Sequence, residues 1–328
     1  MDTESLRTLL RALVFAAPLA VPLTACGGSP PPSRPVVHLD PAPAPDPEPG
    51  TDPDETPPPE THTRNDGTMD PDEFDRQWRD SLGGGGAPPD PQVMIMEGRP
   101  LMSDRGPVRA SLLGVEGNAP VLASHPEAAA RWLDVALAEH ASVASFARAV
   151  MELSALGAPT ALLEGHLKAG LDEVRHTEIA FEMAGRFGAP HRVPGPMPVP
   201  PPRAASLARL VVDTFLEGCV NETLAALMAT RAAAHCEDAM VRAALETLAE
   251  DEARHAALAW QTVRWALESD PSVRPQLASV ALPVVPEGGA HQPGLLACGV
   301  LDAAETNRAA RDALARVVVP MRDELLER

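Results

Sequence analysis

The sequence predicts an all-α protein. Ala, Leu and Val dominate the 45% of residues that are hydrophobic, aromatic residues make up only 3%, and tyrosine is absent. This composition favours helices over β-sandwiches or barrels, whose strands are rich in aromatic and β-branched residues. Apolar residues also recur with helical spacing over long stretches beyond residue 124, and several of these stretches end at a glycine or a proline.

Capping and helix-breaking residues define the predicted helix boundaries. Ser124 with Pro126 and Glu127 has the pattern of an N-cap followed by a proline in the first turn. Gly157 and Gly188 end the first two helices, because glycine readily adopts the backbone conformation of a helix C-terminus. The predicted helices cover residues 126–156, 160–187, 206–234, 238–269 and 301–326, the last with Pro320 as a kink.

The links between these helices predict their arrangement. Short links join the first helix to the second and the third to the fourth, so each pair should be antiparallel. The proline-rich link around Pro194–Pro202 is long enough, as extended polyproline, to return along a whole helix. We therefore expect residues 124–270 to form a four-helix bundle with one long crossover, followed by a C-terminal loop and helix in residues 271–328.

The N-terminus has the pattern of a bacterial export signal. Arg7 and Arg11 precede a short apolar stretch that ends at Leu23-Thr24-Ala25-Cys26, and Asp2 and Glu4 depart from the usual positive charge. The tetrad resembles a lipoprotein lipobox, which implies that residues 1–25 are a signal peptide and that Cys26 is lipidated. The expected location is the cell envelope, with the protein anchored to a membrane by lipid. A plain secretory signal is the alternative.

The composition of residues 26–90 predicts a disordered tether. From residue 27 to residue 90 the chain holds 16 of its 37 prolines, and 14 acidic residues against 4 arginines. Such a segment cannot bury a core, since its charges repel and its prolines favour extended chain. Phe74 and Trp78 within it are a candidate docking motif without an identifiable partner. Residues 91–123 are expected to form a small extended or hairpin segment around Ser103–Gly106.

The same string, Asp-Glu-x-Arg-His, occurs twice, at 172–176 and at 251–255. Glutamate and histidine three residues apart lie on one face of a helix, so Glu173 with His176, and Glu252 with His255, can each reach one point. Small apolar residues share these faces. Because a carboxylate among apolar side chains is costly unless it is paired or bound to a cation, both pairs are candidate metal ligands.

The first and third helices supply candidates for two further ligands. Glu139 lies on the apolar face of the first helix. In the third helix, Glu217 and Glu222 are five residues apart and so are expected on different faces of an α-helix. We favour Glu222, because its face carries small residues such as Gly218 and Ala225 that leave room for a metal cluster.

The set Glu139, Glu173, His176, Glu222, Glu252 and His255 resembles the ligand pattern of the ferritin-like di-iron carboxylate superfamily, which includes rubrerythrin, bacterioferritin and the bacterial tRNA hydroxylases. The resemblance covers about residues 126–269 and implies a dinuclear metal centre. Asp172 and Asp251 have two interpretations: each accepts the free ring N–H of a ligand histidine on the other helix, or each pairs with Arg175 or Arg254 on the surface.

Four glutamates and two histidines form an oxygen-rich donor set that suits two iron ions, or manganese, better than structural zinc. The resemblance implies a ferroxidase, or an oxidoreductase that reduces oxygen or peroxide. The alternative is a non-catalytic envelope binding or structural lipoprotein with a structural or vestigial metal site. The net charge of −19 disfavours nucleic acid as a partner. A homodimer is compatible with the sequence, and the substrate and electron donor are left open.

Overall fold

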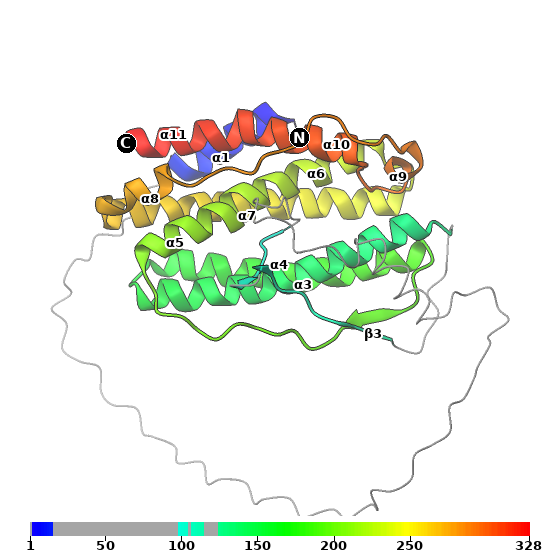
Figure 1. Ribbon diagram of the computed structural model, residues 1–328, viewed down its shortest axis with the longest axis horizontal. Helices are drawn as coiled ribbons and strands as arrows, with labels where there is room; N and C mark the ends of the chain where they lie inside the picture. Colours follow the sequence, from blue (N-terminus) through cyan, green and yellow to red (C-terminus); the bar gives the residue numbers. More distant parts are fainter. Residues whose placement is uncertain (1, 16–97, 104–105, 115–123) are drawn as a thin grey trace, which may run out of the picture. The chain divides into compact units, whose positions relative to one another are not determined.

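The structure is a computed structural model that describes residues 2–15, 98–103, 106–114 and 124–328. Helices make up most of these residues, with only a few short strands, so the predicted all-α class is confirmed (Figure 1). The predicted tether, the candidate motif Phe74/Trp78 and Cys26, the expected site of lipidation, lie outside the described residues.

Four long helical segments pack along one another. They are α3 (Pro126–Ala155), α4 (Thr160–Arg186), α5 (Leu207–Asp213) continuing through a π-helical turn η1 (Thr214–Val220) into α6 (Asn221–His235), and α7 (Ala239–Ser269). Helix α3 packs on α4, α6 packs on α7, and α4 also contacts α7, so the two pairs face each other (Figure 1). These bounds lie close to those expected from the sequence.

The ends of these helices differ in one detail from the expectation. The side chain that caps α3 is His125 rather than Ser124: His125 Nδ1 accepts a hydrogen bond from the backbone N–H of Ala128 at 3.2 Å. Asp238 caps α7 through its carboxylate, which accepts from the N–H groups of Met240 and Val241. Both side chains satisfy N–H groups that have no partner inside the helix.

The third long segment is not a continuous α-helix. Its backbone is π-helical over η1, where hydrogen bonds run between residues five apart instead of four. Residues i and i+5 then lie on the same face, so the expectation that Glu217 and Glu222 point to different faces is wrong. Both side chains are buried.

The long link from α4 to α5 runs along the α3–α4 pair (Figure 1). Within it, β4 (Arg192–Pro194) pairs antiparallel with β3 (Leu112–Gly114). Strands β1 (Met102–Ser103) and β2 (Gly106–Pro107) pair around the expected turn at 103–106. The segment before the four long helices therefore pairs partly with itself and partly with the crossover.

The C-terminal region contacts α6. It contains η2 (Pro271–Val273), α8 (Arg274–Ala278), α9 (Pro293–Ala297), α10 (Ala303–Ala313), a second π-helical turn η3 (Leu314–Val318) and α11 (Val319–Glu327). The helix expected over 301–326 is thus interrupted by η3, and Pro320 lies in the first turn of α11, where a proline needs no N–H partner. Helix α10 and η3 both contact α6.

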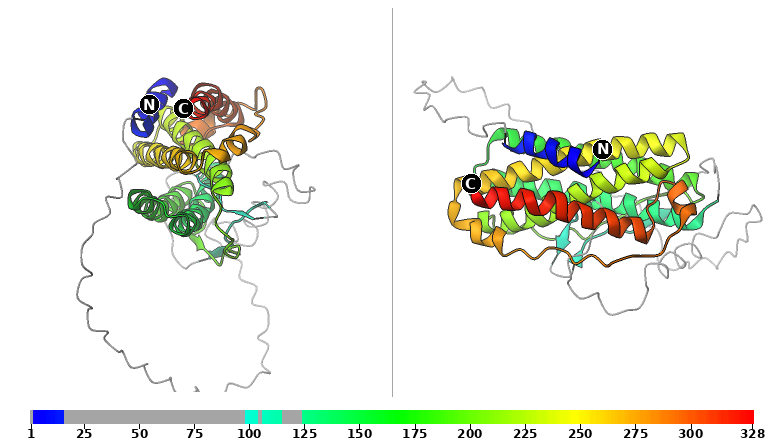
Figure 2. Two further views of the ribbon diagram at one scale, coloured as in Figure 1. Left: turned by 90° about the vertical axis from the view of Figure 1, so that its left-hand side faces the viewer. Right: turned by 90° about the horizontal axis from the view of Figure 1, so that it is seen from above.

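The segment expected to be the signal peptide contains α1 (Thr3–Phe15), which contacts α7 and η3 (Figure 2). Leu6, Leu10 and Val14 are fully buried in this contact. At its edge, Arg11 Nε lies 2.8 Å from Glu324 Oε2. Among the described residues, none of the helices combines the length and the apolar character needed to cross a membrane.

Candidate metal centre

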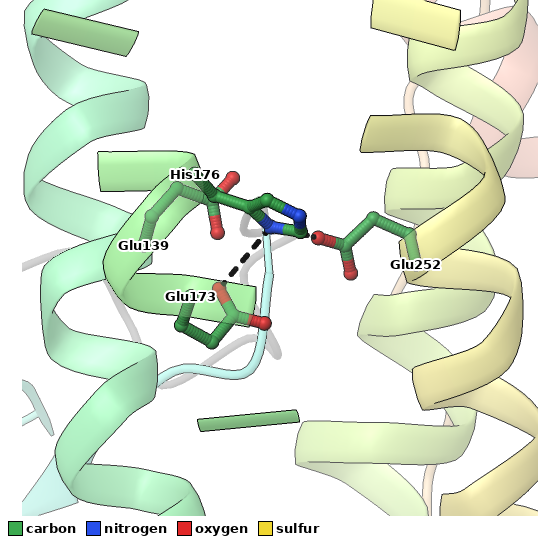
Figure 3. Close-up of side chains that lie close together, drawn as sticks. All are labelled: Glu139, Glu173, His176 and Glu252. Carbon is green, nitrogen blue, oxygen red and sulfur yellow. Dashed lines mark ion pairs between the residues drawn. The ribbon is translucent and has the colours of Figure 1, made fainter. Parts of the chain in front are cut away.

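The two Glu-x-x-His pairs face each other in the interior, on α4 and α7. Glu173 and His176 have no exposed surface, while Glu252 is 2% exposed and His255 is 3% exposed. Figure 3 shows His176 between Glu173 and Glu252, with Glu139 of α3 beside them. The helical spacing of three residues brings each glutamate and its histidine to the same interior face, as the sequence predicts.

Each histidine lies close to both glutamates. His176 Nδ1 is 3.2 Å from Glu252 Oε1 and 3.7 Å from Glu173 Oε2. His255 Nδ1 is 3.0 Å from Glu173 Oε1 and 3.6 Å from Glu252 Oε2. One oxygen of each carboxylate therefore faces each imidazole, so the arrangement is nearly symmetric about Glu173 and Glu252.

Six side chains form two groups whose geometry could hold metal ions. The first group is Glu139, Glu173, His176 and Glu252, and the second is Glu173, Glu222, Glu252 and His255. Within each group the donor atoms lie within 4.8 Å of one another. Glu173 and Glu252 belong to both groups, whereas Glu139 belongs to one group and Glu222 to the other.

The missing hydrogen-bond partners and the spacing of the donor atoms in this cluster suit a bound cation. Apart from the imidazole–carboxylate contacts given above, several donor atoms have no hydrogen-bond partner: both carboxylate oxygens of Glu173, Glu222 and Glu252, Oε2 of Glu139, and Nδ1 of His176 and His255. Buried polar atoms rarely stay unpaired, because the cost is about 1–3 kcal/mol for each group. Octahedral ligands at about 2.1 Å from an ion lie about 3 Å apart, which is close to the spacings here.

The pKa shifts of the cluster residues also indicate a site that suits a cation. Burial, together with the charges of Glu173 and Glu252, raises the pKa of Glu139 well above its ordinary value. Burial and the neighbouring Glu252 do the same to the pKa of Glu222. Burial alone would lower the pKa of His176, but the carboxylates of Glu173 and Glu252 raise it to about 11. Without a cation, the cluster therefore holds protons in place of one.

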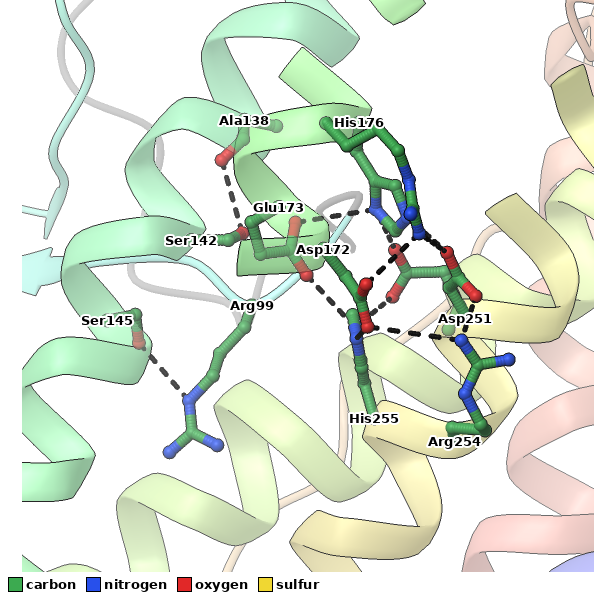
Figure 4. Close-up of polar contacts among 12 residues, drawn as sticks. Arg99, Ala138, Ser142, Ser145, Asp172, Glu173, His176, Asp251, Arg254 and His255 are labelled. Carbon is green, nitrogen blue, oxygen red and sulfur yellow. Dashed lines mark hydrogen bonds and ion pairs between the residues drawn. The ribbon is translucent and has the colours of Figure 1, made fainter. Parts of the chain in front are cut away.

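The aspartate of each repeat contacts the histidine of the other (Figure 4). His176 Nε2 lies 3.0 Å from Asp251 Oδ2, and His255 Nε2 lies 3.4 Å from Asp172 Oδ2. A carboxylate only accepts hydrogen bonds, so Nε2 carries the proton and Nδ1 presents its lone pair to the carboxylate cluster when the imidazole is neutral.

The surface pairing also exists. Arg175 Nη2 lies 3.0 Å from Asp172 Oδ1 and 2.8 Å from Asp251 Oδ2, and Arg254 pairs with Asp251. The two interpretations of the aspartates are therefore not exclusive. Each carboxylate lies between an interior imidazole and exposed guanidinium groups, which hold it in its charged form and lower the pKa of both aspartates.

Glu217 is buried but belongs to neither ligand group. It forms an ion pair with Arg148 of α3, and Ser145 Oγ donates a hydrogen bond to it at 3.3 Å. The choice of Glu222 over Glu217 agrees with this geometry, but for a different reason from the one in the sequence. The two residues differ by their partners, not by the face on which they lie.

Two residues near the cluster had no signal in the sequence. Arg99 is 2% exposed, donates from Nε to Ser145 Oγ at 3.2 Å and stacks over Phe146. Gly98 has a positive φ of 64°, and a Cβ there would lie 2.9 Å from Glu139 Oε2. Only glycine allows this close approach without displacing the carboxylate. The contacts involve residues about 40 positions away, so no local pattern could have revealed them.

His166 and His140 are not part of the cluster. His166 is fully buried, with Nδ1 2.9 Å from the carbonyl oxygen of Leu162 and its ring edge-on to Phe146. Burial lowers its pKa to about 3, so it stays neutral. His140 is only half-buried and is in neither ligand group. Cys236 and Cys298 are free thiols.

No protein-family model, curated protein or solved structure matches this chain. What the site could do is therefore inferred from its own geometry. Two buried groups of glutamate and histidine side chains that share two carboxylates could hold metal ions.

Proposed function

We propose that this protein has a ferritin-like four-helix bundle whose six ligands hold two iron ions, and that it is an oxidoreductase that reduces dioxygen or hydrogen peroxide. The observation that carries the proposal is the sharing of Glu173 and Glu252 between two four-residue groups. Two separate structural metal sites have no need of shared ligands. A dinuclear centre requires them, because bridging carboxylates hold two ions at short range.

The geometry suggests a role for each ligand. Glu173 and Glu252 present one oxygen toward each histidine, so they would be the carboxylates that both ions share. Glu139 would complete the coordination of the ion bound by His176, and Glu222 that of the ion bound by His255. Asp172 and Asp251 hold the imidazoles with the unprotonated nitrogen toward the carboxylate cluster, where it would bind an ion.

The donor set favours iron. Carboxylate oxygens with one imidazole per ion suit ferrous iron, and they suit manganese almost equally well. When bound, two adjacent ferrous ions would supply electrons to dioxygen or hydrogen peroxide. Carboxyl groups whose pKa values are raised by burial, such as Glu139 and Glu222, can take up or release protons as the charge of the centre changes.

Anaerobic iron loading followed by oxygen or peroxide tests the proposal. We expect the chain to bind two ferrous ions, and we expect oxidant to produce an absorption band of oxo-bridged ferric iron that bleaches on reduction. Glu173→Gln should lose both ions, because it removes a bridging ligand. Glu182→Gln, an exposed position on the same helix, is the matched control. Tightly held zinc with no redox response would instead support a structural metal site.

We also propose that the protein is anchored to a membrane of the cell envelope by lipid on Cys26, because the tetrad at residues 23–26 resembles a lipobox. Metabolic labelling with palmitate in a bacterial host checks this. Labelling should be lost in Cys26→Ser and retained in Cys236→Ser. Label that persists in Cys26→Ser would refute the anchor without affecting the metal proposal.

A further inference from the structure

Cys236 and Cys298 each follow the last residue of a helix. Cys236 is the C-cap of α6, Cys298 is the C-cap of α9, and these two helices are in contact. A backbone hydrogen bond joins the two ends, since the N–H of Glu237 donates to the carbonyl oxygen of Ala297 at 3.1 Å. It links the peptide group directly after Cys236 to the peptide group directly before Cys298.

This hydrogen bond fixes how far apart the two cysteines can be. With standard peptide dimensions, it keeps the Cα atoms of Cys236 and Cys298 within about 8 Å of each other. Disulfide bonds join residues whose Cα atoms are about 4.4–6.8 Å apart. A movement of about 1–2 Å at the end of α9 is therefore the most that a disulfide between them requires.

The sulfur of Cys236 is directed toward the segment that contains Cys298. A Cβ on Gly299, the residue after Cys298, would lie 3.3 Å from Cys236 Sγ. Gly299 also has a positive φ of 72°, which favours glycine and lets the backbone pass close to this sulfur. Burial and the neighbouring Cys236 raise the pKa of the Cys298 thiol, in agreement with two thiols that lie close together.

The two thiols differ in their exposure to solvent. Cys236 is 3% exposed, whereas Cys298 is half-buried, so a reagent from solution meets Cys298 first. Cys219, the other free cysteine among the described residues, is fully buried in η1. The geometry therefore singles out one pair of cysteines and one order of reaction.

We propose that Cys236 and Cys298 form an intramolecular disulfide by exchange with an external low-molecular-weight disulfide. The thiolate of Cys298 attacks one sulfur of the external disulfide, whose S–S bond breaks and releases a first thiolate. The thiolate of Cys236 then attacks Sγ of Cys298 and releases the second. The two cysteine protons pass to the released thiolates, so two protein thiols are oxidised as one external disulfide is reduced to two thiols.

The bond would close a loop that contains all of α7, the helix that carries Glu252 and His255. Closing this loop restricts the unfolded chain, so the oxidised protein should be more stable than the reduced one. The cell envelope, in which the N-terminal sequence leads us to expect the protein, is an environment where disulfides persist. The inference goes beyond the proposed function and does not depend on a bound metal.

Equilibration of the folded, full-length chain with reduced and oxidised glutathione tests the inference. Free thiols are then alkylated with iodoacetamide in urea, and the chain is digested with trypsin without reduction. We expect a linked pair of peptides, residues 232–242 with Cys236 and residues 265–308 with Cys298, that separates on reduction. The peptide of residues 210–231, which contains Cys219, should be alkylated instead.

Two variants and a second measurement support the assignment. Cys298→Ser should abolish the linked peptides, and Cys219→Ala, the matched control, should retain them. Oxidation should raise the melting temperature of the unsubstituted chain by about 5–10 °C and leave that of Cys298→Ser unchanged. Thermal unfolding of the reduced variants verifies that each is folded.

Three results would overturn the inference. They are linked peptides that form only in urea, a glutathione adduct on Cys298 that persists in the folded chain, and a melting temperature that falls on oxidation. The second would show that the sulfur of Cys236 cannot reach Cys298. A chain that forms the disulfide but fails to bind iron would leave this inference intact and refute the proposed function instead.

Discussion

Glu173 and Glu252 differ from the other two glutamates of the cluster because each lies within 4 Å of both imidazoles. Glu139 and Glu222 each complete only one group. The same residue type on four helices thus has two roles, and the difference follows from which helices carry the histidines. Replacing a shared ligand should affect both ions, whereas replacing an unshared one should affect mainly one.

Glu222 and Glu217 provide a direct comparison of a candidate ligand with a buried ion-pair partner. Glu222→Ala should reduce bound iron from two ions to at most one, while Glu217→Ala should keep both. Glu217→Ala should also lower the free energy of unfolding by about 1–3 kcal/mol, because it leaves the half-buried guanidinium of Arg148 without its charged partner. Metal analysis and urea denaturation measure these two effects, and the opposite pattern would mean that the ligands are wrongly assigned.

Asp251 should affect metal affinity without being a ligand. Asp251→Asn removes the charge that orients His176, so iron affinity should fall by about 10- to 100-fold with the stoichiometry unchanged. Glu250→Gln, at the neighbouring exposed position, is the control. Competition with a chelator measures the affinity. If both variants bind iron equally well, the contact between Asp251 and His176 has no role in the site.

At the scale of elements, the π-helical turn η1 determines what the third long segment contributes. It places Glu217 and Glu222 on one buried side, with Arg99 close to both carboxylates. Gly218 lies within this turn, and a Cβ there would be 2.5 Å from the Cβ of Ala259 on α7. The turn and the glycine together allow close contact between the third segment and α7.

Helix α1 contributes stability to the full-length chain. Leu10→Ala should lower its free energy of unfolding by about 2–4 kcal/mol, because the side chain is fully buried. Leu9→Ala on the exposed side of the same helix should cost less than about 1 kcal/mol. Urea denaturation of both variants measures the difference. Equal costs would show that α1 does not pack as described.

Cleavage before Cys26 would expose the surface that α1 covers. A chain that begins at residue 26 should therefore bind more of an apolar dye such as anilinonaphthalene sulfonate, and should melt at a lower temperature than the full-length chain. An unchanged dye signal would indicate that the side chains beneath α1 rearrange to close the surface.

At the scale of the whole molecule, the metal-free cluster links stability to pH. His176 has a pKa of 6.5 in the unfolded chain and about 11 in the folded one. The stabilisation that His176 contributes to the folded state is therefore complete below pH 6.5 and is lost as the pH rises toward 11. The raised pKa values of Glu139 and Glu222 act in the same direction, since the folded state retains their protons longer. The lowered pKa values of Glu252, Asp172 and Asp251 affect the stability only at acidic pH, where these carboxylates take up protons.

The metal-free chain should accordingly lose stability in alkali. Between about pH 7 and pH 9 its free energy of unfolding should fall by about 1 kcal/mol or more per pH unit, close to the value for one proton. The zinc-loaded chain should show a smaller slope, because the ion replaces the protons. Urea denaturation across this range measures both slopes, and identical slopes would argue against a metal at these residues.

The sequence by itself determined the helical class, the approximate helix ends and the two Glu-x-x-His pairs. These features are local: helical periodicity, caps, helix-breaking residues and spacings of three residues act within one or two turns. The burial of the six candidate ligands could also be anticipated, since the faces that carry them are apolar.

Only the tertiary structure decided which carboxylates are shared, what neutralises Glu217, and that Gly98 and Arg99 lie beside the site. It also decided that η1 is π-helical and that the ends of α6 and α9 bring Cys236 and Cys298 close together. Each of these depends on contacts between residues far apart in the chain, including the approach of α4 to α7 and the return of residues 98–101 to α3. The free energies of such contacts are set by packing and burial in the folded state, which no local sequence pattern encodes.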